Sequence, residues 1–382
     1  IDAAGSEAPA EFMFYLPEFK ALSSSEVATA TFHNVLTQRG AKARDTLNWS
    51  KAIDAALRTY GDKADVVFGS HNWPSWGQDN VKTFLTHHRD TYRFIHDQVL
   101  RLANSGETAT EIAEQVGEPA HAKTDFSTRG YYGTYNHNAK AVFQYYFGWW
   151  DGVPANYNRH IPTEESQRYV AAMGGAKKAL AIGIKAYDAG DYRWVAEVVN
   201  HAVFADPSNS EARNLQADVL EQLGYQSESS TFRNAYLMGA QELRKGPPPP
   251  APSHVRARSL IRAMTIEQVF DVLSVRVMSE KIGGFSHCVN WTFTDMAGTP
   301  DHQWVLGLSN RTMYYIQGRH DAGAAATITI TRELLLEIIA QVTTFMDELT
   351  AGTVTIDGDA AALLNIFGNL DTFATGFAIV EP

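Results

Sequence analysis

Three side chains that could hold a metal ion lie on loops rich in small residues. Glu7 lies in the stretch GSEAP at 5–9, Glu26 in SSSEV at 23–27, and His71 in GSHNWPSWG at 69–77. Carboxylate oxygens and imidazole nitrogens together are ligands that zinc and similar divalent metals accept. These residues therefore predict a metal site, although each glutamate could instead begin a helix and His71 could be an ordinary loop histidine.

A complete zinc site needs more ligands than this sequence visibly supplies. Catalytic zinc normally takes at least three protein ligands, and a two-metal site takes more, often from closely spaced histidines. None of the 13 histidines is spaced as His-x-His or His-x-x-x-His. The sequence therefore indicates one part of a metal site.

The elements around His71 predict an α/β arrangement. An amphipathic helix is expected at 50–60, a buried strand at 64–68 and a long helix at 80–102. A strand, a loop with polar groups and then a helix is a common way to present ligands at the end of a sheet. On the long helix we expect the histidines to face solvent; these are His87, His88 and His96.

The loop itself has features that would serve a ligand. Gly69 and Gly77 allow the backbone to turn tightly on either side of His71. Trp73 and Trp76 are expected to shield the imidazole from water.

Two further regions follow. Residues 170–236 have the helical period and the small residues of tetratricopeptide-like hairpins, with Gly190 at a turn and Pro207 at a helix end. The proline-rich stretch KGPPPPAP at 245–252 reads as a semi-rigid spacer. Beyond it the pattern predicts an α+β domain, with strands at 289–294, 327–331 and 353–356 and one helix at 332–349.

Composition excludes several classes of protein. A net charge of −11 over 382 residues argues against a nucleic-acid surface, and no apolar run is long enough to span a membrane. The single cysteine, Cys288, excludes an internal disulfide and a cysteine-based zinc site. Small molecules or other proteins are the expected partners.

Eight stretches together carry a resemblance to a known family, the alkylsulfatases. Four resemble the second half of its metallo-β-lactamase-fold catalytic domain, two its helical dimerisation domain and two its sterol-carrier-like C-terminal domain. In chain order they are EAPAE at 7–11, EVATATFHN at 26–34, TQRGAKARD at 37–45, SHNWPSWG at 70–77, YYGTYNHN at 131–138, YFGWWDG at 146–152, DGD at 357–359 and FAIVEP at 377–382.

The resemblance implies a multidomain fold. It comprises a partial αβ/βα metallo-β-lactamase fold at 1–105, an all-α tetratricopeptide-like dimerisation domain at 106–245, a proline-rich linker at 246–253 and an α+β sterol-carrier-like domain at 254–382. The last domain could cradle an alkyl chain or serve only as a lid or interface. The dimerisation domain implies a homodimer.

The resemblance also implies a metal centre with two zinc ions. In the family a His-x-His-x-Asp-His motif in the first half of the catalytic domain binds zinc, and this sequence, which begins at Ile1 without methionine, lacks that motif. Glu7, Glu26 and His71 are then the metal ligands of the second half, with one carboxylate bridging the metals. We expect the N-terminal half to be cleaved off, to form a separate chain or to be absent from this sequence.

The implied reaction is hydrolysis of alkyl sulfates such as dodecyl sulfate to alcohol and sulfate by a hydroxide bound to two metals. Arg39 is the first candidate to bind sulfate and Arg44 the second, because a planar guanidinium can donate two parallel hydrogen bonds to such a group. An ion pair with Asp45 is the alternative for Arg44. Tyr132 and His137 are candidate substrate-binding residues that could donate to sulfate or to the leaving alkoxide.

Two other functions stay open at this point. One is a lipid- or protein-binding scaffold without catalysis, and the other is a metallo-hydrolase that acts on a phosphoester or a lactam. Family members are often exported, so the resemblance implies a periplasmic or secreted protein, although no leader is visible in this sequence.

Overall fold

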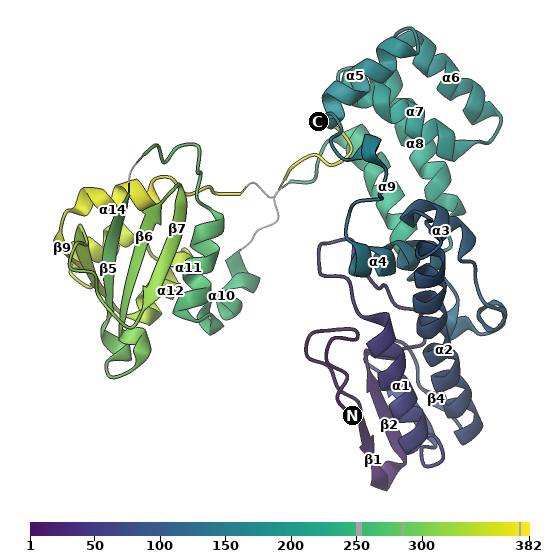
Figure 1. Cartoon of the computed structure of the whole chain (residues 1–382), viewed down its shortest axis with the longest axis horizontal. Coiled ribbons are helices and arrows are strands. Elements are labelled where there is room, and N and C mark those ends of the chain that lie inside the picture. Colours follow the sequence, from purple (N-terminus) through teal and green to yellow (C-terminus); the bar gives the residue numbers. More distant parts are fainter. Residues whose placement is uncertain (250–253, 285, 374–375) are drawn as a thin grey trace. The chain divides into compact units, whose positions relative to one another are not determined.

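The computed structural model describes residues 1–249, 254–284, 286–373 and 376–382 (Figure 1). The chain divides into two compact units. Unit 1 comprises Ile1–Pro247 together with Ala378–Pro382, and unit 2 comprises Pro248–Phe377. Residues 250–252 of the predicted proline-rich spacer lie outside the described residues.

Unit 1 begins with a four-stranded sheet in the order β1-β2-β3-β4. Its two central strands, β2 and β3, are parallel, and each edge strand is antiparallel to its neighbour. The strands are β1 (Phe14–Leu16), β2 (Ala21–Ser25), β3 (Val66–Gly69) and β4 (Ser75–Trp76).

Two long helices pack beside this sheet and against each other, α1 (Thr46–Tyr60) and α2 (Gln78–Ala103). Asp45 starts α1, because its carboxylate accepts hydrogen bonds from the backbone N–H groups of Leu47 and Asn48. Buried side chains of the sheet and both helices form one core around Trp49 and Tyr92, whose rings stack 4.2 Å apart. The predicted strand and both predicted helices of this region are present.

The rest of unit 1 is helical. The helices are α3 (Ala109–Gln115), α4 (Tyr135–Phe147), α5 (Pro162–Ala172), α6 (Ala176–Asp188), α7 (Tyr192–Ala205), α8 (Ser210–Gln226) and α9 (Ser230–Lys245). Gly190 has a φ of 77° in the turn between α6 and α7, and Pro207 follows the end of α7, as their positions in the sequence predicted. Short 3-10 turns lie at Pro17–Phe19, Ala120–Lys123, Phe126–Thr128 and Pro154–Asn156.

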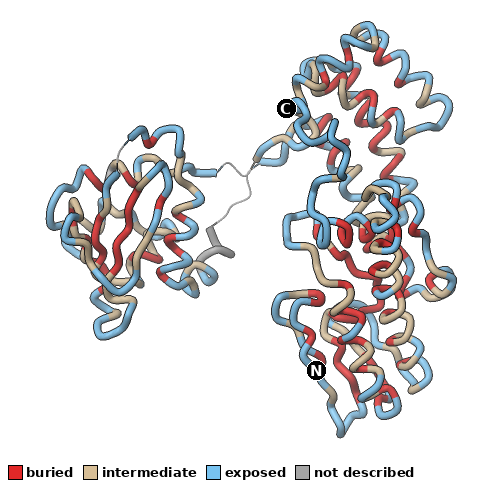
Figure 2. Tube along the Cα trace, in the orientation of Figure 1, coloured by how far each residue is buried: buried red, intermediate tan, exposed pale blue. Residues whose placement is uncertain are grey.

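Unit 2 is an α+β domain around a five-stranded sheet in the order β7-β6-β5-β8-β9. Its strands are β5 (His287–Phe293), β6 (Gln303–Ser309), β7 (Thr312–Gln317), β8 (Ala326–Ile330) and β9 (Thr355–Gly358), and its helices are α10 (His254–Ala263), α11 (Ile266–Val275), α12 (Arg332–Ile339), α13 (Phe345–Ala351) and α14 (Ala360–Phe367). Two 3-10 turns lie at Thr294–Met296 and Pro300–His302. Figure 2 shows buried residues along its strands. Trp291 and Trp304 join Phe270 of α11 in a core separate from that of unit 1.

One predicted element of unit 2 is wrong. The helix expected at 332–349 is broken into α12 and α13. Gln341 has a φ of 56°, outside the right-handed helical region, and the side chain of Thr344 accepts a hydrogen bond from the backbone N–H of Asp347 and so starts a new helix.

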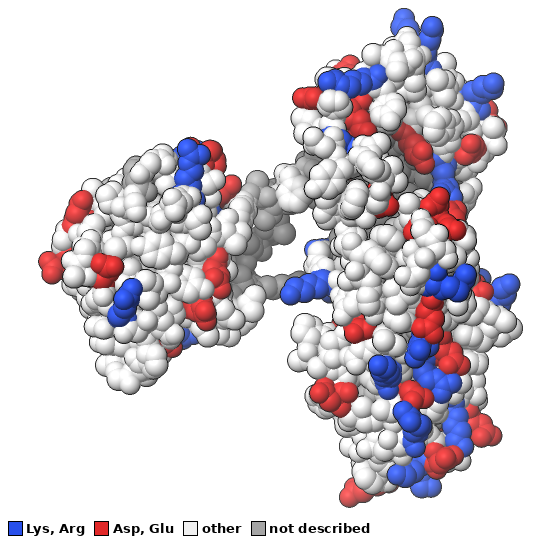
Figure 3. All heavy atoms as spheres, viewed as in Figure 1, with Lys and Arg blue, Asp and Glu red and all other residues white. Residues whose placement is uncertain are grey.

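The surface of unit 1 mixes charges. On the face drawn in Figure 3, Lys and Arg side chains lie among Asp and Glu without forming one continuous basic patch. Ion pairs on α1 and α2 include Arg58 with Asp54 and Arg93 with Asp97. Within the described residues, no helix is both long enough and apolar enough to cross a membrane.

Candidate metal centre

The candidate metal ligands meet at one edge of the first sheet. Glu26 follows the last residue of β2, and the loop that carries His71 follows β3. Because β2 and β3 are parallel, their carboxyl ends lie at the same edge. Gly69 is needed there, since a Cβ atom would lie 2.9 Å from the carbonyl oxygen of Ser25.

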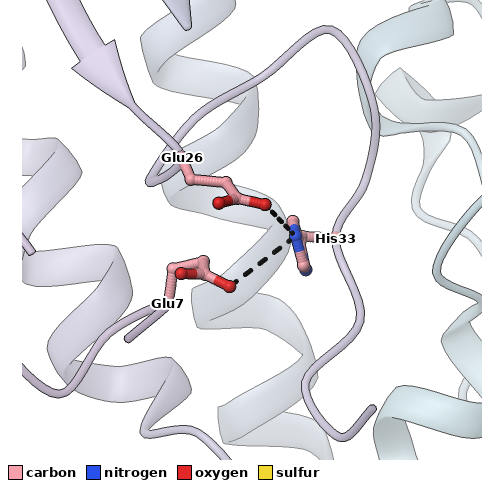
Figure 4. A group of neighbouring side chains, drawn as sticks. All are labelled: Glu7, Glu26 and His33. Carbon is pink, nitrogen blue, oxygen red and sulfur yellow. Dashed lines mark hydrogen bonds and ion pairs between the residues drawn. The ribbon is translucent and has the colours of Figure 1, made fainter. Parts of the chain in front are cut away.

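Two imidazoles contact the same carboxylate oxygen of Glu26. Nε2 of His71 lies 2.9 Å and Nε2 of His33 lies 3.2 Å from Oε1 of Glu26. Oε1 of Glu7 lies 3.8 Å from Nε2 of His33. Figure 4 shows Glu7, Glu26 and His33 pointing toward one another, with ligand atoms within 4.8 Å.

Burial and neighbouring charges shift the pKa values of Glu7, Glu26 and His33. Burial raises the pKa of Glu7, although the neighbouring guanidinium of Arg44 opposes the rise. Burial would also raise the pKa of Glu26, but hydrogen bonding and charge from His33 and His71 outweigh it and lower that pKa. Burial, followed by the charge of Arg44, lowers the pKa of the imidazole of His33.

The donor set fits a divalent metal ion. The carboxylates of Glu7 and Glu26 lie close to the imidazole of His33, and the imidazole of His71 contacts Glu26. Arg44 is the neighbouring cation. Zinc accepts carboxylate oxygen together with imidazole nitrogen as ligands. Of the sequence-predicted ligands, Glu7 and Glu26 therefore lie together, and His71 contacts Glu26.

His33 was not among the predicted ligands. It lies in the loop that follows Glu26, and its backbone is held by the side chain of Asn138, which donates to the carbonyl oxygen of His33 at 2.9 Å. The sequence offered one signal, a histidine seven residues after a candidate carboxylate in a stretch of small residues. That signal does not show which way the loop folds back.

The expected shielding of His71 is wrong for this chain. The side chain of His71 is 59% exposed, and Trp73 and Trp76 are themselves exposed. Trp73 stacks on Phe126 with ring centroids 5.9 Å apart instead of covering the imidazole.

The two arginines differ in their surroundings. Arg44 is nearly buried and points inward, where it forms an ion pair with Glu7 and donates to Nδ1 of His33 at 2.9 Å and to the carbonyl oxygen of Asn34 at 2.5 Å. Its guanidinium also lies 5.8 Å from the centroid of the Trp49 ring. Arg39 is exposed and forms no hydrogen bond or ion pair with any residue that the structure describes.

The two other predicted substrate residues lie on either side of Gly133. The ring of Tyr132 meets that of His33 edge-on, with centroids 5.3 Å apart. Nε2 of His137 lies 2.6 Å from the carbonyl oxygen of Leu36. Gly133 allows this approach, because a Cβ atom would lie 2.4 Å from the carbonyl oxygen of His33. Tyr132 therefore lies beside the candidate metal centre, whereas the imidazole of His137 is hydrogen-bonded to the backbone of Leu36.

Comparison with known proteins decides the family. The alkyl sulfatase dimerisation family matches residues 108–246 and the alkyl sulfatase C-terminal family matches residues 255–382. A linear primary-alkylsulfatase from a Pseudomonas strain is 32% identical over 376 residues, with 96% of this chain and 70% of that protein covered. The chain belongs to the alkylsulfatase family.

Two further relatives are more similar. A linear primary-alkylsulfatase of Pseudomonas sp. is 44% identical, and the match covers all of this chain but 56% of the relative. The solved structure of the stereoselective inverting sec-alkylsulfatase Pisa1 from Pseudomonas sp. is 41% identical with a TM-score of 0.93, and it covers 100% of this chain and 59% of Pisa1. The chain therefore has a multidomain alkylsulfatase fold, over little more than half the length of these relatives.

Proposed function

We propose that the protein hydrolyses alkyl sulfate esters, such as dodecyl sulfate, to an alcohol and sulfate with the help of two zinc ions. The observation that carries the proposal is the convergence of Glu7, Glu26 and His33, with His71 in contact with Glu26, in a chain 44% identical to a linear primary-alkylsulfatase. The relatives described above are alkylsulfatases, which favours a sulfate ester over a phosphoester or a lactam as the substrate.

Glu7, Glu26 and His71 would hold the metal ions, with Glu26 between the two imidazoles as the candidate bridging carboxylate. Bound zinc supplies Lewis acidity and a nucleophilic water near neutral pH. The further ligands would come from an N-terminal half outside this chain. Arg44 would keep the buried carboxylate of Glu7 ionised and fixed in direction.

Arg39 remains our first candidate to bind the sulfate group. It is exposed on the loop between His33 and Arg44 and its guanidinium is not engaged elsewhere in the described part of the chain. Arg44 would act on sulfate only by giving up its contacts with Glu7 and His33. The ring of Tyr132 lies against that of His33, which makes Tyr132 the first candidate to donate to the leaving oxygen, ahead of His137, whose Nε2 already contacts the carbonyl oxygen of Leu36.

Unit 2 has a cavity that suits the alkyl part of such a substrate. Its volume is about 590 Å³, and its lining is mostly apolar, with Trp291, Leu335, Phe345, Leu349 and Phe367 among the side chains. A cavity of this size and character can enclose a medium alkyl chain. We propose that unit 2 holds alkyl chains, as its expected likeness to sterol carriers implies.

We further propose that the protein forms a homodimer through its dimerisation domain. Exposed aromatic side chains gather after α4, where the ring of Tyr157 lies 6.2 Å from that of Trp149 and 5.5 Å from that of Trp150. Large exposed apolar side chains of this kind mark contact surfaces. We call Phe147, Trp149, Trp150 and Tyr157 the aromatic segment.

The test uses the natural full-length protein loaded with zinc, with release of sulfate from dodecyl sulfate as the measurement. Glu26→Ala should lower kcat/KM by about 100-fold or more, because loss of even a residue behind the ligands costs about 10- to 100-fold. Glu18→Ala, which removes an exposed carboxylate at the tip of the same sheet, is the matched control and should retain activity. Zinc-loaded protein that releases no sulfate, or a fully active Glu26→Ala variant, would refute the proposal.

A further inference from the structure

We infer that a cavity beside α2 binds a neutral alcohol with an apolar body, whose hydroxyl donates a hydrogen bond to Nε2 of His87. The cavity has a volume of about 390 Å³ and lies between the loop that carries His71, the first half of α2 and the segment at 124–127. None of the described residues that line it is a candidate metal ligand. The cavity is therefore a second place at which this chain can hold a small molecule.

The polar part of the cavity is a pair formed by His87 and Asp125. Nδ1 of His87 lies 2.5 Å from Oδ2 of Asp125. Oδ1 of the same carboxylate accepts from the backbone N–H and from the hydroxyl of Ser127, at 2.9 and 2.8 Å. Burial alone would raise the pKa of Asp125, but its hydrogen bonds with His87 and Ser127 outweigh burial and lower that pKa. The carboxylate is therefore ionised near neutral pH.

The ionised carboxylate identifies which nitrogen of His87 carries hydrogen. Because a carboxylate can only accept, Nδ1 of His87 is the donor of this pair. In the neutral ring the lone pair then lies on Nε2. No hydrogen bond to Nε2 is found among the described residues, and His87 lines the cavity. A ligand that brings a hydrogen-bond donor can use this acceptor.

The ring of His87 is held in one orientation. It packs on the ring of His121, with centroids 4.9 Å apart, and Nε2 of His121 lies 2.8 Å from the hydroxyl oxygen of Thr91. The side chain of His87 is 27% exposed and that of Asp125 is 22% exposed. An acceptor that is fixed before binding loses little conformational entropy when a ligand arrives.

Aromatic and other apolar side chains form much of the remaining lining. Trp73, Phe84 and Phe126 line the cavity together with Pro74. The ring of Phe126 lies between those of Trp73 and Tyr131, with centroids 5.9 and 4.5 Å apart. A mostly apolar wall with a few fixed polar groups is typical of small-molecule sites. The ligand should therefore have an apolar body next to its donor.

Charge separates the possible ligands. No Lys or Arg is among the described residues that line the cavity, and the charge of Asp125 repels an anion such as a sulfate ester. Three hydrogen bonds already compensate this carboxylate, whereas an ammonium group would lose its own hydration against an apolar wall. A neutral alcohol meets neither cost. Alcohols released by the proposed reaction belong to this class, and this source of the ligand alone rests on the proposed function.

The experiment measures binding at the cavity itself. The natural full-length protein, loaded with zinc, is labelled with fluorotryptophan, and the fluorine resonance that is absent in Trp73→Phe is assigned to Trp73. Hexanol, hexylamine and hexanesulfonate, which is not an ester, are titrated at about pH 8, where free imidazole is neutral. His87→Leu removes the acceptor and Phe126→Ala removes part of the apolar wall. His160→Leu changes an exposed histidine outside the cavity and is the matched control.

We expect hexanol to shift the resonance of Trp73 in a saturable way in the wild type and in His160→Leu. His87→Leu should raise the Kd of hexanol about 3- to 10-fold, as expected for one lost hydrogen bond. Phe126→Ala should raise that Kd as well, because apolar contact area is lost. Hexanesulfonate should bind at least about tenfold more weakly than hexanol, and hexylamine should bind no more tightly than hexanol.

Three results would overturn the inference. The first is a resonance of Trp73 that hexanol does not shift. The second is a Kd of hexanol that stays at the wild-type value in His87→Leu or in Phe126→Ala. The third is tighter binding of hexylamine or hexanesulfonate than of hexanol, which would make the ligand a charged molecule. None of these measurements depends on sulfate release, so such a result would leave the proposed function standing.

Discussion

At the scale of single residues, Arg44 connects the parts of the metal centre. Its guanidinium contacts Glu7 and His33, and His33 in turn contacts Glu26. Both partners of the ion pair are nearly buried, because the side chain of Glu7 is 7% exposed and that of Arg44 is 14% exposed. Removing one member of such a pair leaves the other charge without compensation.

Arg44→Ala should therefore lower the free energy of unfolding of the apoprotein by about 3 kcal/mol, as measured by urea denaturation. The matched control is Arg58→Ala, which breaks an ion pair with Asp54 on the surface of α1 and should cost about 0.5 kcal/mol or less. In the double variant with Glu7→Gln, part of the loss should be recovered, since no buried charge remains. Equal losses in Arg44→Ala and Arg58→Ala would contradict this account.

Sequence reasoning reached the candidate ligands but not their surroundings. Glu7, Glu26 and His71 could be selected because each polar group lies among small residues on a loop. The inward direction of Arg44 and the approach of His33 could not, because both depend on how the loop at 26–45 folds over α1 and α4. Contacts such as that between Asn138 and His33 join residues far apart in the chain, and no local pattern encodes them.

At the scale of elements, the predicted orientation of two histidines on the helix α2 is wrong. His88 and His96 were expected to face solvent, yet both are buried. The buried side chains of α2 recur at steps of three and four, through Val81, Leu85, His88, Tyr92, Ile95 and Val99. His88 thus occupies a core position of an amphipathic helix. The spacing of its apolar neighbours predicts that its side chain lies on the buried face.

Burial gives His88 a measurable effect on stability. Burial lowers the pKa of His88 to about 4, below the ordinary value of 6.5. As pH falls below 6.5 the unfolded chain takes up a proton that the folded chain does not, so stability is lost until the folded pKa is reached. Between about pH 7.5 and 5.5 this imidazole should cost about 1 kcal/mol of unfolding free energy.

His88→Leu should therefore flatten the decline of unfolding free energy over that pH interval, measured by urea denaturation at each pH. The matched control, His160→Leu, changes an exposed histidine and should keep the slope of the wild type. The same slope in His88→Leu as in the wild type would show that His88 does not resist protonation.

In unit 2, the sequence predicted some of the strands and helices correctly and missed one break in a helix. Alternating residues predicted strands that the structure contains as β5, β8 and β9, whereas the break between α12 and α13 was missed. The residues 332–349 are largely compatible with a helix, and the break depends on a single left-handed residue, Gln341, followed by Thr344 as a cap. One such conformation is decided by packing more than by local preference.

At the scale of the whole molecule, the end of the described chain packs against unit 1. The carboxylate of Glu242 on α9 accepts hydrogen bonds from the backbone N–H groups of Ile379 and Val380, at 2.6 and 2.9 Å. Arg213 on α8 forms an ion pair with Glu381. The sequence showed only a segment similar to the C-terminal family, because contacts over more than 130 residues leave no local pattern.

Glu242→Ala should free this segment and loosen the helices beneath it. Each lost hydrogen bond to the carboxylate costs about 1.5 to 3 kcal/mol, so backbone amides of α8 and α9 should exchange hydrogen at least about tenfold faster. Amides of β5 and β8 should keep their rates. Glu197→Ala, at an exposed glutamate of α7, is the control. Faster hydrogen exchange in β5 and β8 alone would contradict the assignment of Ala378–Pro382 to unit 1.

The aromatic segment provides the last test, of the proposed dimer. Trp149 is 75% and Tyr157 64% exposed, although both lie within the region matched by the dimerisation family. If a second copy covers them, replacing Trp149 and Trp150 by glutamate places two charges in an apolar contact. Since a central aromatic contributes about 2 kcal/mol or more to an interface, the Kd of the dimer should rise by about 30-fold or more.

Sedimentation of the natural full-length protein over a range of concentrations measures that constant. Phe19→Glu is the matched control, because Phe19 is 71% exposed but lies outside residues 108–246. It should leave the dimer intact. A wild-type protein that sediments as a monomer would refute the homodimer. A dimer whose Kd does not change in the double variant would show that the contact lies on another face of the helical domain, away from the aromatic segment.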